Sequence, residues 1–206
     1  EIAAHAKKMG ITFFSTATDY DSVDLIDELG VPVYKVASMD IINWPLLKYI
    51  SQKGKPIILS TALANIKEIE NAVKFINANN NKEIVLMQCT GIYPTPNELS
   101  NIGVINHFRE KFKLPIGFSD HTIGIDAPML AVTAGASIFE KHITLDKNME
   151  GPDHFMCALP SEIKLMIKKI KYARSILGNT KKEILKEEKK LRNLIRRSLV
   201  SKEKIE

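Results

Sequence analysis

Short apolar runs recur along the chain, each followed by a turn and then by apolar residues at helical spacing. Runs of Val, Ile, Leu and Phe without polar alternation are typical of strands buried on both faces of a parallel sheet. We predict six strands, at Thr12–Ser15, Val33–Ala37, Pro56–Ser60, Ile84–Cys89, Pro115–Phe118 and Ser137–Lys141. The predicted helices span residues 21–29, 45–53, 66–78, 99–112, 126–135 and 162–177.

Several helix boundaries carry their own signals. Asn65 is expected to cap the third helix, with Glu68 three residues later completing a capping box. Gly30, Gly54 and Gly178 lie where helices are expected to end, because glycine readily adopts the left-handed conformation that closes a helix.

The repeat of strand and helix predicts an α/β fold. Strand starts lie 21 to 31 residues apart, so six consecutive βα units build either a doubly wound sheet or most of an eightfold barrel. Polar residues follow nearly every strand, which favours a barrel with its site at the carboxyl ends of the strands. A doubly wound sheet would gather them at one switch point, and no dinucleotide or Walker motif occurs. We therefore predict an incomplete (β/α)8 TIM barrel, with about six of the eight units.

The composition is that of an ordinary soluble globular chain, with 45% hydrophobic and 26% charged residues. No segment reaches the roughly 18 apolar residues of a membrane helix, and no signal-peptide pattern opens the chain. The first residue is Glu1, so we expect the start of the protein to be missing. The two cysteines, Cys89 and Cys157, form no disulfide framework and suit a reducing cytoplasm.

Charge is unevenly distributed. Residues 1–161 carry 14 Lys and Arg against 18 Asp and Glu, whereas residues 162–206 carry 15 against 6. A basic end can bind nucleic acid, but here the charges interleave with apolar residues at helical spacing and no aromatic platform accompanies them. We expect a solvated helix face and neither a nucleic-acid nor a membrane partner. The barrel is predicted over residues 1–178, a linker over 179–195 and the start of another domain over 196–206.

Two histidines occupy matching positions after neighbouring strands. His121 follows the fifth predicted strand and His142 the sixth. Because neighbouring strands lie about 5 Å apart, the two imidazoles can share one divalent ion. Imidazole suits several first-row metals, so the residues leave Mn, Zn, Co and Fe open. Either histidine alone would more often be structural.

A lysine and several hydroxyls follow other strands and predict an anion site. Lys35 lies in a mostly apolar strand, and an unpaired buried ammonium is costly, so an anionic substrate is its simplest partner. A Schiff-base lysine is the alternative, which the metal pair disfavours. The strand-end hydroxyls can instead cap helices. The predicted cradle for a phosphate or carboxylate is Thr16, Lys35, Ser38, Ser60 and Ser119.

Three loop residues are further candidates. Asp40 follows the strand of Lys35 and is expected either to act as an acid or base or to cap the next helix. Tyr93 lies in a proline-fixed loop that can present it to a ligand. Asp153 follows the last strand, where it can accept hydrogen bonds from sugar hydroxyls.

These motifs, in this order and spacing, resemble the sialic acid synthase family. They are FFST, YKVAS, KPIILST, QCTGIYPTP, GFSDHTIGI, FEKHITLD and GPDH, between about residues 10 and 178. The resemblance implies a cytoplasmic transferase that condenses phosphoenolpyruvate with an N-acetylated amino sugar, such as N-acetylmannosamine, and releases phosphate by C–O cleavage. It further implies that residues 196–206 begin a truncated SAF (antifreeze-like) domain, and that the full-length protein is a homodimer.

The resemblance also assigns roles to individual residues. His121 and His142 would bind the divalent metal, Mn²⁺ first, with Mg²⁺ and Co²⁺ as alternatives. The phosphoenolpyruvate ligands would be Thr16, Lys35, Ser38, Ser60 and Ser119. The sugar contacts would be Tyr93 and Asp153, and Asp40 would take the place of an acidic residue near the reacting centre.

The sequence departs from the family pattern in three ways. Gly91 replaces a usual Asn or Ser, and Ala62 replaces a usual Gly. In addition, the first two strands and most of the SAF domain are absent, so the chain itself is expected to be inactive. The alternatives are another metal-dependent barrel that condenses phosphoenolpyruvate or acts as an aldolase, or an inactive anion-binding fragment.

Overall fold

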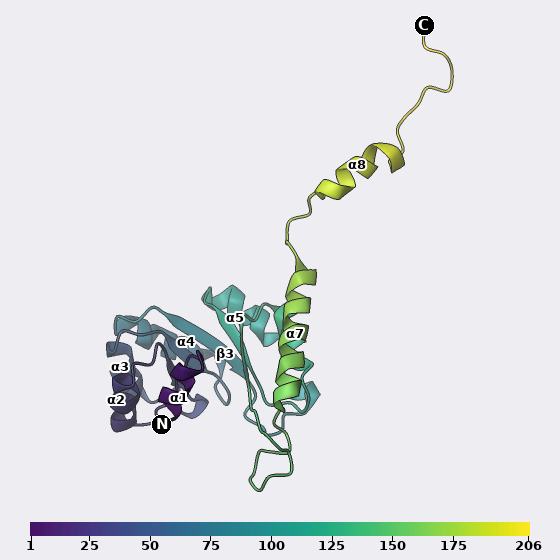
Figure 1. Ribbon diagram of the computed structural model, residues 1–206. Coiled ribbons are helices and arrows are strands. Elements are labelled where there is room, and N and C mark those ends of the chain that lie inside the picture. Colours follow the sequence, from purple (N-terminus) through teal and green to yellow (C-terminus); the bar gives the residue numbers. More distant parts are fainter. The chain divides into compact units, whose positions relative to one another are not determined.

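The computed structural model describes residues 1–206, which divide into two compact units, residues 1–176 and 177–206. The elements of the first unit alternate between helix and strand (Figure 1). Its strands are β1 (Tyr34–Val36), β2 (Ile57–Ser60), β3 (Ile84–Cys89), β4 (Ile116–Asp120) and β5 (Ile138–Lys141). Its helices are α1 (Ile2–Lys8), α2 (Tyr20–Glu28), α3 (Trp44–Gln52), α4 (Ile66–Ala78), α5 (Val104–Phe112), α6 (Ala127–Ala134) and α7 (Pro160–Leu177), with 3₁₀ helices η1 (Ser38–Asp40) and η2 (Asn97–Leu99).

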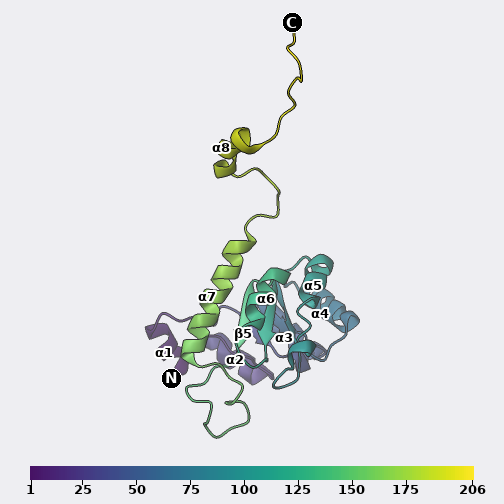
Figure 2. The same cartoon turned by 90° about the vertical axis from the view of Figure 1, so that its right-hand side faces the viewer.

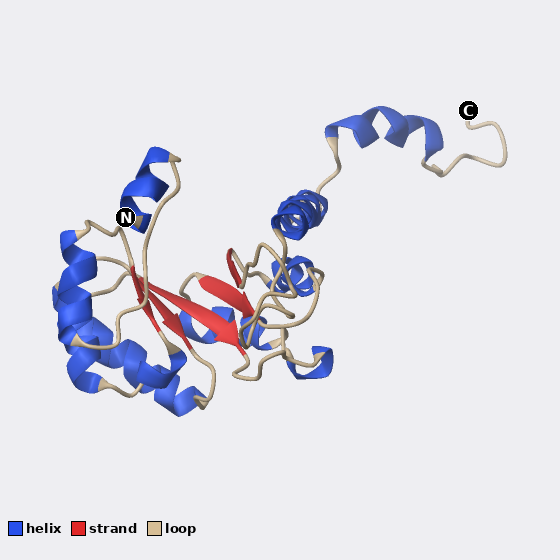
Figure 3. Ribbon diagram, turned by 60° about the horizontal axis from the view of Figure 1, so that its bottom comes forward, coloured by secondary structure: helices blue, strands red, loops and turns tan.

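The five strands form one parallel sheet in chain order, β1 to β5. Figures 2 and 3 show the strands side by side with the helices outside them. This consecutive order and the α/β alternation confirm the predicted class, a parallel α/β sheet of partial-barrel type, whereas a doubly wound sheet would reverse its strand order. The number of units in a closed barrel stays a prediction.

The prediction of a strand at Thr12–Ser15 was wrong. Only Thr16 pairs with the sheet, through a single parallel bridge to Lys35. The adjoining β1 has just three residues, so it offers too few backbone partners for a continuous ladder. The single bridge nevertheless places Thr16 beside Lys35 at the edge of the sheet.

The helix boundaries follow the sequence signals closely. The Asn65 side chain accepts hydrogen bonds from the backbone of α4, and the Glu68 carboxylate accepts one from the Asn65 N–H, so the predicted capping box is confirmed. The predicted helix at 99–112 starts late, at Val104, because Asn101 has a φ of 46° and a left-handed residue cannot continue a right-handed helix.

The core lies between the outer face of the sheet and the helices. Side chains alternate across a strand, and the fully buried set includes Tyr34, Ile57, Leu59, Leu86 and Phe118, which pack with α2 to α6. The opposite face of the sheet carries the polar candidates described below.

Gly117 in β4 lies on this opposite face and tests how closely neighbouring strands pack there. A Cβ at Gly117 would lie 2.2 Å from Met87 Sδ and 2.9 Å from the Ile138 carbonyl oxygen. We expect Gly117→Ala to lower the free energy of unfolding by about 1–3 kcal/mol, because the neighbouring backbone cannot move aside freely. Gly103→Ala is the control, since nothing lies within 4 Å of its added carbon. Equal urea midpoints for the two variants would contradict the prediction.

The contacts of Asp27 join α2 to two neighbouring elements. They predict that the stability of the fold depends on pH. An ion pair with Lys55 (2.6 Å) and a hydrogen bond from the Tyr34 hydroxyl (2.7 Å) lower the pKa of Asp27 from 3.8 to about 2. A carboxyl group whose pKa is lower in the folded than in the unfolded state stabilises the fold at pH values above its unfolded-state pKa. This stabilisation is lost as the pH falls through its folded-state pKa. We therefore expect stability to fall between about pH 4 and pH 2 more steeply in the wild type than in Asp27→Asn, measured by thermal melts. Parallel pH profiles would contradict this.

The second unit contains α8 (Lys186–Ile195), a helix with no buried residue. It lies within residues 179–195, the segment predicted as a linker. No helix in the structure combines the length and apolar character needed to cross a membrane.

Candidate active site at the strand ends

Strand register places the predicted anion ligands on one face of the sheet. Paired residues of neighbouring strands point to the same face, as do residues two apart along a strand. The partner of Lys35 in β2 lies two residues before Ser60, so Lys35 and Ser60 point to the same face. The pairing of β2 with β3 and of β3 with β4 places Ser119 on this face as well. Ser119 pairs with Glu140, and Thr16 pairs with Lys35 at the other edge. The predicted cradle residues in or beside the strands therefore share one face.

Lys35 lies at the centre of a hydrogen-bonded cluster on this face. Its ammonium donates to Ser60 Oγ at 2.7 Å and lies 3.3 Å from Glu140 Oε2. The Ser119 hydroxyl donates to Glu140 Oε1 at 2.6 Å. Lys35 and Glu140 come from the two outermost strands of the sheet. Their contact shows that the sheet is curled, as in part of a barrel.

Glu140 is the site residue that the sequence analysis missed. Lys35 was expected to pair with an anionic substrate, but in this structure its anionic partner is Glu140. The sequence did contain a signal for Glu140. Ser119 and Glu140 each precede a candidate histidine by two residues, so each shares the face of the sheet on which that histidine lies.

His121 is held in one tautomer. Its Nδ1 lies 2.7 Å from the Thr90 carbonyl oxygen, which can only accept, so Nδ1 carries the proton. Nε2 then presents its lone pair towards the cluster, 3.3 Å from Ser119 Oγ. Burial lowers the pKa of His121, which favours the neutral ring. This is the form in which imidazole binds metals.

His142 and Tyr93 complete an aromatic group. The ring centroids of His121 and His142 are 5.5 Å apart, with an interplanar angle of 65°. Tyr93 stacks on His121 at 4.0 Å and meets His142 edge-on at 5.6 Å. Burial raises the pKa of Tyr93, and the nearby carboxylates of Glu140 and Asp153 raise it further, so its phenol stays a hydrogen-bond donor. The structure thus places Tyr93 against both histidines.

The donor set fits a divalent ion held by two histidines. No group of three or more His, Cys, Asp and Glu side chains in the structure is arranged to hold a metal. The fixed Nδ1 hydrogen bond of His121 is the usual means of orienting a metal-binding imidazole. Water or substrate oxygens would supply the remaining ligands of such an ion.

The remaining candidates lie less centrally. Ser38 Oγ accepts from the Ala62 N–H at 3.0 Å and lies 3.5 Å from Cys89 Sγ. Asp40 is buried, and its Oδ1 accepts from Asn43 Nδ2 whereas its Oδ2 has no partner. Asp40 does not cap the next helix, because Asn43 caps α3. Asp153 is partly buried, and its carbonyl accepts from Cys157 Sγ.

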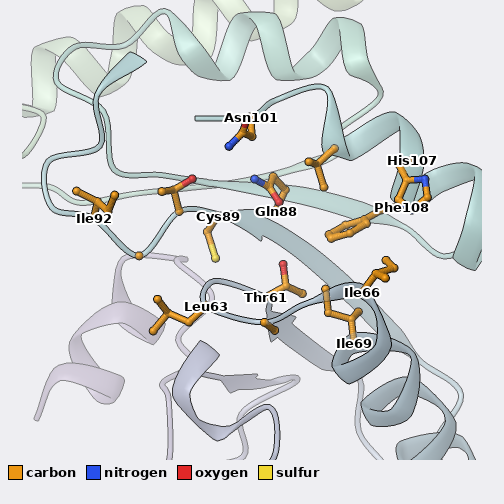
Figure 4. Close-up of a pocket in the computed structure, with 14 residues that line it drawn as sticks. Thr61, Leu63, Ile66, Ile69, Gln88, Cys89, Ile92, Asn101, His107 and Phe108 are labelled. Carbon is orange, nitrogen blue, oxygen red and sulfur yellow. The ribbon is translucent and has the colours of Figure 1, made fainter. Parts of the chain in front are cut away.

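A separate cavity of about 440 Å³ lies between the start of α4 and α5 (Figure 4). Its lining includes Thr61, Gln88, His107 and Phe108. No Asp, Glu, Lys or Arg lines it, so it lacks a counter-charge for an anion. Cys89 borders this cavity and also contacts Ser38, so the two regions adjoin. The charged cluster of Lys35 and Glu140 is therefore the better candidate for chemistry.

Comparison with known proteins identifies relatives along the whole chain. The NeuB family matches residues 1–182. An N,N'-diacetyllegionaminic acid synthase from Campylobacter jejuni is 44% identical over 207 residues, covering 100% of this chain and 62% of that protein. An N-acetylneuraminate-9-phosphate synthase from Homo sapiens is 34% identical over 100% of this chain and 57% of that protein. The chain thus spans about three fifths of the length of these curated relatives.

A solved structure agrees with these sequence matches. The crystal structure of an N-acetylneuraminic acid synthetase from Leptospira borgpetersenii serovar Hardjo-bovis, in complex with citrate, superposes with a TM-score of 0.89 at 36% identity. The match covers 96% of this chain and 70% of that one.

Proposed function

Because this chain belongs to the NeuB family, we propose that it carries the core of a sialic-acid-type synthase. The reaction condenses phosphoenolpyruvate with an N-acetylated amino sugar, N-acetylmannosamine or a related diacetamido sugar, and releases phosphate by C–O cleavage. The observation that carries the proposal is the geometry of the strand ends. A buried lysine, two hydroxyls and two facing histidines lie together on one face of the sheet.

The lysine and hydroxyls suit a phosphorylated carboxylic acid. Lys35 is 8% exposed and offers an ammonium at the carboxyl end of β1. Ser60 and Ser119 add hydroxyl groups, and charge-assisted hydrogen bonds of this kind are the strong ones in anion recognition. We assign the phosphate and carboxylate of phosphoenolpyruvate to this group, with Thr16 and Ser38 as further ligands.

His121 and His142 would hold a divalent ion, Mn²⁺ or alternatively Mg²⁺ or Co²⁺. When bound, such an ion supplies Lewis-acid polarisation of a carbonyl oxygen. The protein's own contribution is orientation, because the Thr90 carbonyl fixes the ring of His121 and Tyr93 stacks against it. Tyr93 and Asp153 are assigned to the sugar.

The carbon chemistry follows from the two substrates. The methylene carbon of phosphoenolpyruvate attacks the aldehyde carbon of the open-chain sugar and forms one C–C bond. The aldehyde oxygen takes the electron pair of the broken C=O π bond and gains a proton, and cationic character is left at the second carbon of phosphoenolpyruvate. Water adds at that carbon and loses a proton, and the resulting tetrahedral intermediate releases phosphate to give the keto acid. Asp40 is the proposed base for the water. For the full-length protein we also propose a SAF domain beginning within residues 196–206, and a homodimer.

A sugar panel with isotopic phosphoenolpyruvate tests this function. The full-length protein is incubated with Mn²⁺, phosphoenolpyruvate labelled with ¹⁸O in the bridging position, and one candidate sugar at a time. We expect phosphate release with N-acetylmannosamine or a diacetamido sugar, with the ¹⁸O in the phosphate because the C–O bond breaks. Release only with aldose phosphates that carry no N-acetyl group would support the alternative class of barrel. Label retained in the organic product would contradict C–O cleavage.

A further inference from the structure

The carboxylate of Glu140 contacts two of the groups that the proposed function assigns to the substrate anion. It lies 3.3 Å from the Lys35 ammonium and accepts the Ser119 hydroxyl at 2.6 Å. We propose that Glu140 is an internal competitor of the anionic substrate, which sets the affinity of the site by holding Lys35 and Ser119 until an anion displaces it. This inference rests on the proposed function and concerns the same site.

The hydrogen bonds of Ser119 indicate that the anion displaces Glu140 and does not bind alongside it. A serine hydroxyl has one proton to donate, and that of Ser119 is given to Glu140. His121 Nε2 lies 3.3 Å from the same hydroxyl and, in the tautomer fixed by Thr90, can only accept. A phosphate oxygen therefore receives the Ser119 proton only after Glu140 releases it.

The charges lead to the same conclusion. The Lys35–Glu140 pair presents no net charge to an approaching anion, and the neighbouring Lys141 is likewise neutralised by Asp120 at 2.8 Å. Without the carboxylate of Glu140, Lys35 would present a full positive charge, and the attraction of an anion would rise accordingly.

Exposure indicates which partner moves. The side chain of Glu140 is 41% exposed, whereas that of Lys35 is 10% exposed. The carboxylate can therefore swing towards water and be solvated there, but the ammonium has no comparable alternative. Ser60 continues to hold Lys35 at 2.7 Å during the exchange, so the lysine stays in place for the incoming anion.

Calorimetric titration with inorganic phosphate and with phosphoenolpyruvate, in metal-free buffer, tests the proposal. Glu140→Gln keeps the size of the side chain and an acceptor for Ser119 but removes the charge. We expect it to bind both anions about tenfold more tightly than the wild type. Glu162→Gln is the matched control, because it removes a glutamate from an ion pair with Lys147 outside the cluster. We expect that control to stay within about twofold of the wild type.

The outcomes separate this inference from the proposed function. Lys35→Met is expected to abolish anion binding; if it binds as well as the wild type, the assigned anion site is wrong. If Lys35→Met loses binding but Glu140→Gln equals or falls below the wild type, only the competitor role is wrong. Should Glu140→Gln melt well below the wild type, Glu140→Thr replaces it, since a β-branched residue suits a strand. Its failure to tighten binding would count equally against the proposal.

Discussion

His121→Ala is expected to reduce the affinity for Mn²⁺ by at least about 100-fold. Changing a residue that merely orients a metal ligand costs about 10- to 100-fold, so losing one of two protein ligands costs at least the upper figure. His121 is 7% exposed and its ring is fixed by the Thr90 carbonyl, and the neighbouring His142 is already assigned to the same ion. Phosphate release in the synthase assay should fall in parallel.

The measurement is a Mn²⁺ titration followed by electron paramagnetic resonance, in which free ion gives the signal. His107→Ala is the control, because His107 is exposed on α5 and lies outside the histidine pair. Thermal melts of both variants establish that they are folded. An unchanged affinity in folded His121→Ala would refute the metal assignment, and with it the proposed role of the pair.

The sheet was largely predictable because its signal is local. The strands are short, mainly apolar runs bounded by turn residues, and five of the six predicted strands are present. Thr12–Ser15 misled the prediction because a strand also needs a partner of adequate length, which a sequence window does not contain. The neighbouring β1 offers three residues only.

The candidate site was predictable to the extent that it follows strand position. Ser119 and Glu140 pair across β4 and β5, and His121 and His142 each lie two residues further along, so register and strand alternation place all four on one face. The pairing of Lys35 with Glu140 was not predictable in this way. It joins the two outermost strands and depends on the curl of the whole sheet, which is a property of the packed helices and not of either segment.

Lys141→Met is expected to lower the free energy of unfolding by about 3–5 kcal/mol, the usual cost of leaving a buried charge without its partner. The side chains of Lys141 and Asp120 are 2% and 0% exposed, and their charged atoms lie 2.8 Å apart. Lys141 also donates to the Thr122 carbonyl, and Asp120 accepts from the Thr122 N–H at 2.9 Å. The Lys141–Asp120 pair therefore fixes the two residues on either side of His121 in the chain.

Urea unfolding of two further variants identifies the cause. Lys169→Met removes a lysine from an ion pair with the largely exposed Asp126, so a change within about 1 kcal/mol is expected. The double variant Lys141→Met/Asp120→Leu removes both buried charges and should recover most of the lost stability, because a buried ion pair and a well-packed apolar pair are often equivalent. If the double variant recovers stability but still binds Mn²⁺ less tightly than the wild type, the pair serves chiefly to position His121. If the double variant is no more stable than Lys141→Met, an unpaired charge is not what destabilises the single variant.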